Sequence, residues 1–206
     1  FRGWQIQKKG KTIQGLLQEK ISKLLKEKIT LLGSGRTDTG VHAIEQSAHF
    51  DCKNQIKELD RFLKSINHFL NKDGVAILKI RKRSNNFHAR FSAVSRTYKY
   101  KTRTNDNIFD KNYTWRVGKL NLSLLNELAS MIIGTHDFTS FSKISSNLNS
   151  RKCNIYESSW YKKDNLLVYK ITGNRFLHHM VRYLVGTMVE VCLLYTSDAA
   201  DDSYRV

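Results

Sequence analysis

In the stretch FHARFSAVSRTYKYKT, residues 87–102, apolar and polar side chains alternate within FHARF and again within TYKYKT. Alternation with a period of two is typical of strands that bury one face. The stretch therefore predicts strands near the middle of the chain. Further strands are expected at residues 75–80 before it and at residues 155–161 and 166–172 after it.

Helices are expected on both sides of these strands. Apolar residues recur at helical spacing in residues 13–29, 55–70 and 122–133. A last helix is predicted by the apolar stripe Leu177, Met180, Val181, Leu184, Val185 and Met188. Because helices and strands do not alternate regularly, as they would around a parallel sheet, the order favours an α+β protein whose antiparallel sheet is backed by helices.

The chain is strongly basic, with 35 Lys and Arg against 18 Asp and Glu in 206 residues and a net charge of +17. Such an excess predicts a polyanionic partner. Residues 79–103 hold nine of these cations and no acidic residue, interleaved with four aromatic rings. Cations that meet phosphates and rings that stack on bases are what single-stranded RNA recognition requires. The alternative is a solvated basic pair of strands with its rings in the core. We favour a mixture, with some rings buried and at least one exposed in a cleft.

The loop GSGRTDTGVHA, residues 33–43, is the best candidate for a site. Its three glycines permit positive φ angles and close approach of a ligand. Between them lie Arg36 and Asp38, so that a carboxylate is held beside a cation that favours its ionised form. A phosphate-binding P-loop is excluded, because no Gly-Lys-Ser/Thr closes the run and a short strand, residues 46–51, follows it. The alternative is that the loop only turns the chain.

Metal, thiol and membrane chemistry find no support in the sequence. The cysteines Cys52, Cys153 and Cys192 are isolated, which argues against a disulfide framework or a zinc site and fits a reducing compartment. His178 and His179 would point to different faces of a helix, so we expect no metal there. No stretch reaches the length of a membrane span, and no secretory leader is visible. With no proline in the chain, turns must rely on Gly, Asn and Asp.

Five motifs together resemble the tRNA pseudouridine synthase A (TruA) family. They occur in the family's order and extend over most of the chain. The resemblance implies the pseudouridine synthase fold, in which two similar halves with antiparallel sheets flanked by helices enclose an active-site cleft. The motifs are GWQ (3–5), GSGRTDTGVHA (33–43), FHARFSAVSRTYKY (87–100), HDFTSF (136–141) and FLHHMVRYLVG (176–186).

The resemblance also implies an activity. Members of the family are isomerases that break the N-glycosidic bond of a uridine in tRNA, rotate the base and rejoin it through carbon 5. Their substrates are uridines at tRNA positions 38, 39 and 40, in the anticodon stem-loop. They act as homodimers without a cofactor, and the cytoplasm is the compartment that the isolated cysteines favour. We therefore expect tRNA and a second copy as partners, and no metal, cofactor or membrane.

Catalytic roles carry over by position. Asp38 would be the catalytic aspartate, acting as a nucleophile on the sugar or as a base that starts elimination; the residues leave both routes open. Arg36 would enter the RNA and help to displace the target base. Arg182 would pair with Asp38 from the second half.

Substrate contacts carry over in the same way. Tyr98 would stack on the flipped uracil, although Tyr100 could exchange roles with it. His42 and Arg90 are the other expected substrate-binding residues.

The resemblance divides the chain into an N-terminal half, residues 1–95, which carries the Asp38 loop, and a C-terminal half, residues 96–191. Residues 192–206 change abruptly to an acidic composition, and we expect them to be a non-native tail. We also expect residues to be missing ahead of Phe1, because the family begins with a strand. The alternatives are a non-catalytic RNA-binding module, an inactive truncated fragment, and another base-processing enzyme such as a glycosylase or nuclease.

Overall fold

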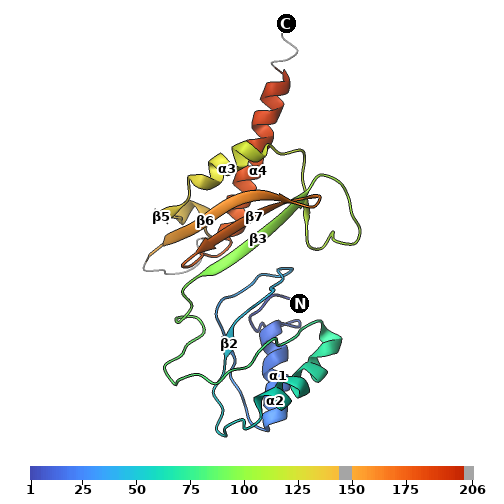
Figure 1. Ribbon diagram of the computed structural model, residues 1–206, viewed down its shortest axis with the longest axis vertical. Coiled ribbons are helices and arrows are strands. Elements are labelled where there is room, and N and C mark those ends of the chain that lie inside the picture. Colours follow the sequence, from blue (N-terminus) through green and yellow to red (C-terminus); the bar gives the residue numbers. More distant parts are fainter. Residues whose placement is uncertain (144–149, 202–206) are drawn as a thin grey trace. The chain divides into compact units, whose positions relative to one another are not determined.

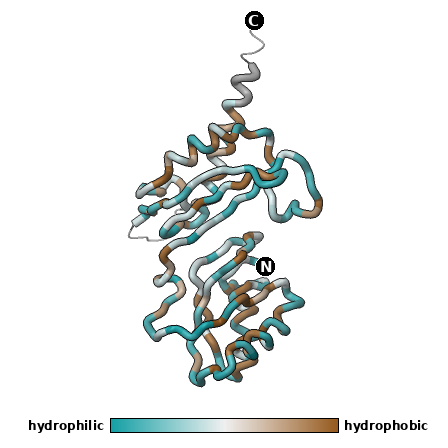
Figure 2. Tube along the Cα trace, in the orientation of Figure 1, coloured by the Kyte–Doolittle hydropathy of each residue, from teal (hydrophilic) through white to brown (hydrophobic). Residues whose placement is uncertain are grey.

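The computed structural model describes residues 1–143 and 150–201 (Figure 1). The chain forms two compact units, Phe1–Ala93 and Val94–Val206, and each is described by itself. Along the helices and strands of both, hydrophobic and hydrophilic residues are interspersed, as Figure 2 shows. The α+β class expected from the sequence is confirmed.

The first unit consists of two helices and one short pair of strands. The helices are α1, Ile13–Leu25, and α2, Leu59–Leu70, which continues into the 3-10 helix η1, Asn71–Asp73. The strands β1, Leu32–Gly33, and β2, Ala48–His49, pair antiparallel. Both expected helices are confirmed, but they are shorter than the ranges that the apolar patterns predicted, residues 13–29 and 55–70.

Local signals explain where α1 begins and ends. The Thr12 hydroxyl caps its start by accepting from the Gly15 N–H at 3.3 Å. Lys26 ends it in the left-handed conformation, φ +54°.

The apolar faces of α1 and α2 meet the N-terminal segment in one core, made of Trp4, Leu16, Leu17, Ile21, Ile29, Leu31, Ile66 and Leu70.

Residues 75–80 were expected to form a strand, and that prediction is wrong. They join neither sheet of the described chain. Asn67 of α2 takes the place of a neighbouring strand: its Nδ2 donates to the Ile77 carbonyl at 2.8 Å and its Oδ1 accepts from the Ile77 N–H at 2.7 Å. Val75 and Ile77 still pack against the core, which accounts for the apolar pattern.

The FHARF half of residues 87–102 is not a strand either. The Phe87 N–H donates to the Ser84 carbonyl at 3.0 Å and the Ser92 N–H to the His88 carbonyl at 2.8 Å, closing two turns. The Nδ1 of His49 accepts from the Ala89 N–H at 3.1 Å. The backbone groups of this segment thus form hydrogen bonds within turns and to an imidazole, and not the strand-to-strand hydrogen bonds that the alternating pattern predicted.

The second unit is built on a five-stranded sheet of order β4-β3-β7-β6-β5. The strands β3, β6 and β7 confirm the expectations from the alternating patterns. All neighbours pair antiparallel except β3 and β4, which are parallel. The bounds are β3 Arg96–Arg103, β4 Trp115–Arg116, β5 Gly134–Asp137, β6 Lys152–Lys163 and β7 Leu166–Gly173.

Asp164 and Asn165 alone join β6 to β7, since Lys163 and Leu166 are paired. Asp164 adopts φ +53°, a left-handed conformation that Asp and Asn tolerate better than most residues. This turn fits the expectation that Asn and Asp replace proline in this chain.

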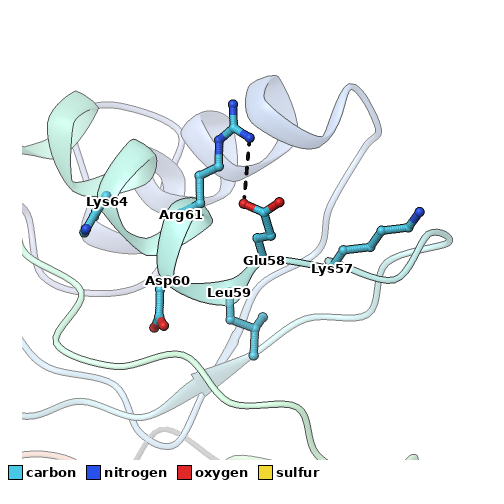
Figure 3. A pocket seen from close by; sticks show the side chains of 6 residues that line it. All are labelled: Lys57, Glu58, Leu59, Asp60, Arg61 and Lys64. Carbon is cyan, nitrogen blue, oxygen red and sulfur yellow. Dashed lines mark ion pairs between the residues drawn. The ribbon is translucent and has the colours of Figure 1, made fainter.

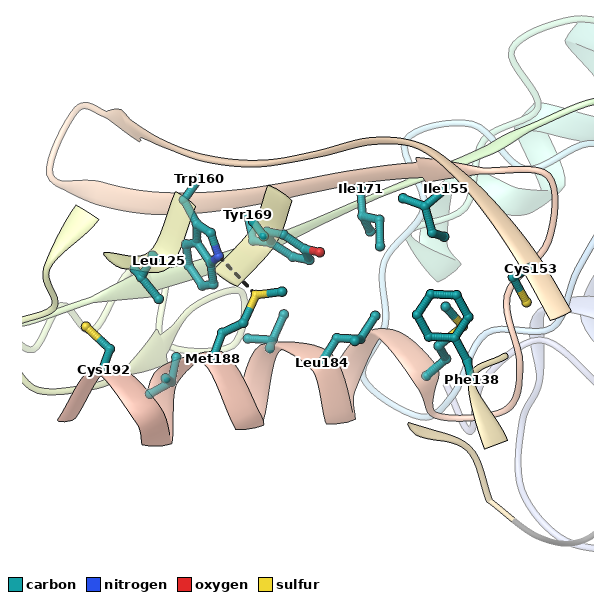
Figure 4. Close-up of a cluster of buried hydrophobic side chains, with 14 of the residues drawn as sticks. Leu125, Phe138, Cys153, Ile155, Trp160, Tyr169, Ile171, Leu184, Met188 and Cys192 are labelled. Carbon is teal, nitrogen blue, oxygen red and sulfur yellow. Dashed lines mark hydrogen bonds between the residues drawn. The ribbon is translucent and has the colours of Figure 1, made fainter. Parts of the chain in front are cut away.

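Two helices, α3, Leu122–Ser130, and α4, Met180–Asp201, pack on the same face of the sheet (Figure 1). Figure 4 shows α4 running along this face, with the Trp160 indole N–H donating to Met188 Sδ at 3.4 Å. The short 3-10 helix η2, Thr139–Phe141, follows β5. The core between them includes Leu125, Phe138, Ile155, Trp160, Tyr169, Ile171, Leu184 and Met188.

The apolar stripe of the last helix is confirmed for Met180, Leu184, Val185 and Met188, which are buried, and Val181 packs partly buried beside them. Leu177 is buried too, but it lies just before the helix begins. The helix does not end where the composition changes. Cys192 is buried in the core, its Sγ accepting from the Asn121 N–H at 3.0 Å, and α4 continues to Asp201. Residues 202–206 of the expected non-native tail lie outside the described residues, and the origin of residues 192–206 stays a prediction. None of the described helices combines the length and apolarity that crossing a bilayer requires.

Tyr169 links stability to alkaline pH. Burial raises the pKa of Tyr169 to about 12, above the usual value of about 10. Because the unfolded chain loses this proton first, the contribution is complete below about pH 10 and falls as the pH rises towards 12. We expect the free energy of unfolding in urea to fall between about pH 9 and pH 11 by about 1.4 kcal/mol more in the wild type than in Tyr169→Phe. Equal falls would contradict this assignment.

Candidate active site in the first unit

The loop that carries Asp38 leaves a strand end fixed by α1. Both backbone groups of Leu31 bond to α1 side chains: the Gln14 Nε2 donates to its carbonyl at 2.7 Å, and the Gln18 Oε1 accepts from its N–H at 3.1 Å. Gln14 and Gln18 are four residues apart and so lie on one face of the helix. The loop thus starts from a fixed point on the core.

The two arms of the loop are joined beyond the strand pair. The Ser34 N–H donates to the Ser47 carbonyl at 2.8 Å. The Gln46 Nε2 donates to the Gly35 carbonyl at 2.7 Å, and the Gln46 Oε1 accepts from the Ser34 hydroxyl at 3.3 Å. Cross-links between the arms limit the conformations open to the residues between them.

Two backbone hydrogen bonds shape the chain at Asp38, one from outside the loop and one within it. On one side the Trp4 N–H donates to the Thr37 carbonyl at 3.1 Å; on the other the Val41 N–H donates to the Asp38 carbonyl at 3.2 Å. The second bond closes a turn in which Gly40 has φ +79°, the position where a type II turn requires glycine. Asp38 itself is half-buried. The Asp38 side chain is therefore carried on a backbone that the Trp4 N–H fixes at the preceding residue.

The other residues predicted in this unit are exposed. Arg36 and His42 flank Asp38 on the same loop, and both reach solvent. Arg90 lies in the turn that follows residue 87, with its guanidinium 5.7 Å from the centre of the Phe91 ring. The structure therefore gathers Asp38, Arg36 and His42 on one loop, with Arg90 on a separate turn.

The second unit carries Tyr98 and Arg182. Tyr98 lies on β3, half-buried, with its ring edge-on to Phe176 at 5.1 Å between centres. Arg182 is exposed on the first turns of α4. The pairing of Arg182 with Asp38 and the stacking of Tyr98 on a base stay predictions.

The two adjacent histidines were expected to diverge on a helix, and that expectation is wrong. His178 and His179 precede α4, and their rings stack with centres 4.0 Å apart. The cause is the left-handed conformation of His179, φ +63°, which turns the chain before the helix begins.

The basic segment, residues 79–103, divides into structural and exposed cations. Arg103 is buried and pairs with Asp110 at 2.8 Å, and Arg96 donates to the Asn174 carbonyl at 2.7 Å. The other seven cations are exposed. The expected mixture of rings is confirmed, since Phe91 is 77% exposed whereas Tyr98 and Tyr100 pack against the core. The expectation that an exposed ring lies in a cleft stays a prediction. The segment therefore offers charge and an aromatic surface to an anionic partner.

Thiol chemistry has little support. Burial raises the pKa of both Cys52 and Cys153, which disfavours the reactive thiolate.

In the motif HDFTSF, hydrogen bonds from the Thr139 hydroxyl and N–H lower the pKa of Asp137. That carboxylate is engaged in shaping the start of η2.

A surface hollow at the start of α2 does not coincide with the Asp38 loop. Figure 3 shows its lining side chains, with Arg61 and Glu58 forming an ion pair at 3.7 Å. The lining combines positive and negative side chains with a single apolar residue. It therefore favours neither an anionic, a cationic nor an apolar ligand. Its residues are Lys57, Glu58, Leu59, Asp60, Arg61 and Lys64.

Sequence reasoning missed the residues that support the loop. Gly3 and Trp4 were noted only as part of a motif, yet both touch the loop: a Cβ on Gly3 would lie 2.4 Å from the Thr37 carbonyl oxygen, and one on Gly33 would lie 2.5 Å from the Trp4 ring. Gln14, Gln18 and Gln46 were not singled out at all. The motif GWQ was the one sequence signal that involved Gly3 and Trp4, and the motif alone did not indicate that they contact the Asp38 loop.

The chain is similar in sequence to known proteins. A family model described as tRNA pseudouridine synthase matches residues 1–92 and 128–200. The chain is 47% identical over 191 residues to a protein named tRNA pseudouridine synthase A from Pelagibacter ubique, covering 91% of this chain and 78% of that one. Proteins of the same name from Parabacteroides distasonis and Borreliella afzelii are 38% and 39% identical; each match covers 93% of this chain and 76% or 78% of the relative.

The cross-link by Gln46 can be tested separately from any activity. Gln46→Leu removes the bonds to Ser34 and Gly35, so we expect a loss of about 1 kcal/mol in the free energy of unfolding. Amide hydrogen exchange in the loop should be faster at the same time. Gln5→Leu, at an exposed position, is the control. Unchanged exchange in the Gln46 variant would mean that the two arms are held together by other contacts.

Proposed function

The chain belongs to the tRNA pseudouridine synthase family, and we propose that it converts uridine to pseudouridine in the anticodon stem-loop of tRNA, at positions 38 to 40. The observation that carries this proposal is the position of Asp38, half-buried on a loop that the Trp4 N–H fixes at the preceding residue, Thr37, and that turns at Asp38 itself. The match to the family includes that loop. The reaction is an isomerisation, so that it consumes neither an oxidant nor a second substrate.

The reaction assigns a task to each predicted side chain. A uridine paired or stacked in a stem has to leave the helix before its glycosidic bond can be reached, which takes roughly a few kcal/mol. Arg36, exposed beside Asp38, is suited to enter the space that the base leaves. Tyr98 would stack on the displaced uracil, and His42 and Arg90 would contact the RNA.

Asp38 would then act at the sugar. Its carboxylate either attacks C1′ of the ribose and forms an ester as the N-glycosidic bond breaks, or removes the C2′ proton so that the uracil leaves by elimination. The uracil turns and its carbon 5 bonds to C1′, which displaces the carboxylate in the first route and is accompanied by return of the proton to C2′ in the second. Carbon 5 gives up its proton and N1 takes one, so that substrate and product are isomers. We propose that Arg182 pairs with Asp38 during these steps. We also propose that the protein acts as a homodimer, as the family resemblance implies, and in the cytoplasm, which fits its isolated cysteines.

The test of this function is Asp38→Asn, which keeps the shape of the side chain and removes its charge. Carbodiimide mapping on unmodified tRNA with a uridine in the anticodon stem-loop should detect pseudouridine with the wild type. In the variant we expect the rate to fall at least about 10²- to 10⁴-fold, while tRNA binding in a filter assay is retained.

Other outcomes would favour the alternatives. Abasic or cleaved RNA would indicate a glycosylase or a nuclease. Binding by both proteins without any product would indicate an RNA-binding module or an inactive fragment.

Binding of tRNA should depend on salt through the exposed lysines of β3. We expect the logarithm of the association constant to fall linearly with the logarithm of salt concentration. Lys99→Ala/Lys101→Ala should weaken binding and reduce this slope by about 2, one for each lost phosphate contact. Lys20→Ala is the control, because Lys20 already pairs with Glu19 at 2.8 Å. An unchanged slope in the double variant would place the phosphate contacts elsewhere.

A further inference from the structure

The loop that carries Asp38 is braced from behind by the N-terminal residues Gly3 and Trp4. The Trp4 N–H donates to the Thr37 carbonyl at 3.1 Å, immediately before Asp38. The Trp4 indole lies against the first residue of the loop, since a Cβ on Gly33 would lie 2.5 to 2.7 Å from its ring atoms. Trp4 therefore touches the loop at its start and again beside Asp38.

Gly3 allows this approach because it has no side chain. A Cβ on Gly3 would lie 2.4 Å from the Thr37 carbonyl oxygen and 3.2 Å from the Asp38 carbonyl carbon. Those atoms belong to backbone, so they can yield only if the loop moves. Gly3 also has φ +75°, which an L side chain rarely adopts.

The bracing segment is itself fixed to the core. The Gly3 carbonyl accepts from the Ile13 N–H at 3.2 Å and the Trp4 carbonyl from the Gln14 N–H at 2.9 Å, at the start of α1. The Trp4 side chain is only 5% exposed. Gln14 also donates to the Leu31 carbonyl at the entrance of the loop. Hydrogen bonds therefore connect the helix α1 both to the bracing segment and to the loop.

We infer that Gly3 and Trp4 are positioning residues for the reaction: they fix the Thr37–Asp38 backbone, and through it the Asp38 carboxylate. This inference rests on the proposed role of Asp38. Catalytic groups have to be held within about 0.5 Å of their productive position, and a displacement of about 1 Å can lower a rate about 100-fold. A side chain on Gly3 would displace the loop without removing any group that reacts.

The test is Gly3→Ala, measured by single-turnover and steady-state pseudouridine formation together with tRNA binding. We expect kcat to fall about 10- to 100-fold, with the dissociation constant for tRNA changed less than about 2-fold. Gly74→Ala is the matched control: Gly74 has φ +66°, so its backbone strain is similar, but nothing lies within 4 Å of its Cβ. The control should retain the wild-type kcat.

A second variant covers the case in which Gly3→Ala does not fold. Trp4→Phe keeps an apolar ring and the backbone N–H but makes the contact with Gly33 looser, so we expect a smaller fall in kcat with tRNA binding unchanged. Wild-type kcat in a folded Gly3→Ala variant, or in Trp4→Phe where the former does not fold, would overturn the inference. So would an equal loss of kcat in Gly74→Ala.

The same series separates this inference from the proposed function. If the wild type forms no pseudouridine, or if Asp38→Asn keeps full activity, the proposed function fails, whatever the glycine variants do. If the wild type is active and depends on Asp38 while Gly3→Ala and Trp4→Phe are unimpaired, only the positioning role fails.

Discussion

Buried backbone groups must form hydrogen bonds, and in the first unit regular sheet supplies few of them. The described part of that unit has one ladder of two residues a strand. Side-chain amides and an imidazole form the hydrogen bonds to the backbone that neighbouring strands would otherwise form. Gln14 and Gln18 hold Leu31, Asn67 holds Ile77, and His49 holds the turn at Ala89. The Asp38 loop depends on this arrangement, because its entrance is one of the segments that these side chains fix.

This constraint also explains which expectations failed. The strands of the second unit followed from alternation, because β3, β6 and β7 pair with one another along their length. Residues 75–80 show a similar apolar pattern, yet their partner is the side chain of Asn67. A pattern reports which side chains are buried, and it does not report whether a strand or an amide satisfies the backbone beside them.

The candidate site could be predicted only in part, for the same reason. Glycine spacing and the family resemblance identified Asp38 and its neighbours, since those features lie within one short segment. The support from Gly3 and Trp4 joins segments far apart in sequence and depends on a close backbone approach. Charge was similarly ambiguous: nothing in the sequence distinguished Arg103, buried against Asp110, from the exposed lysines of β3.

The turn at Asp164 has a consequence for how these 206 residues fold. It reverses the chain with Asp and Asn, as the whole sequence reverses direction without proline. Peptide bonds that do not precede proline are almost entirely trans even in unfolded chains, whereas bonds to proline exchange between isomers over tens to hundreds of seconds. Refolding of these residues from denaturant therefore lacks the slow phase of prolyl isomerisation.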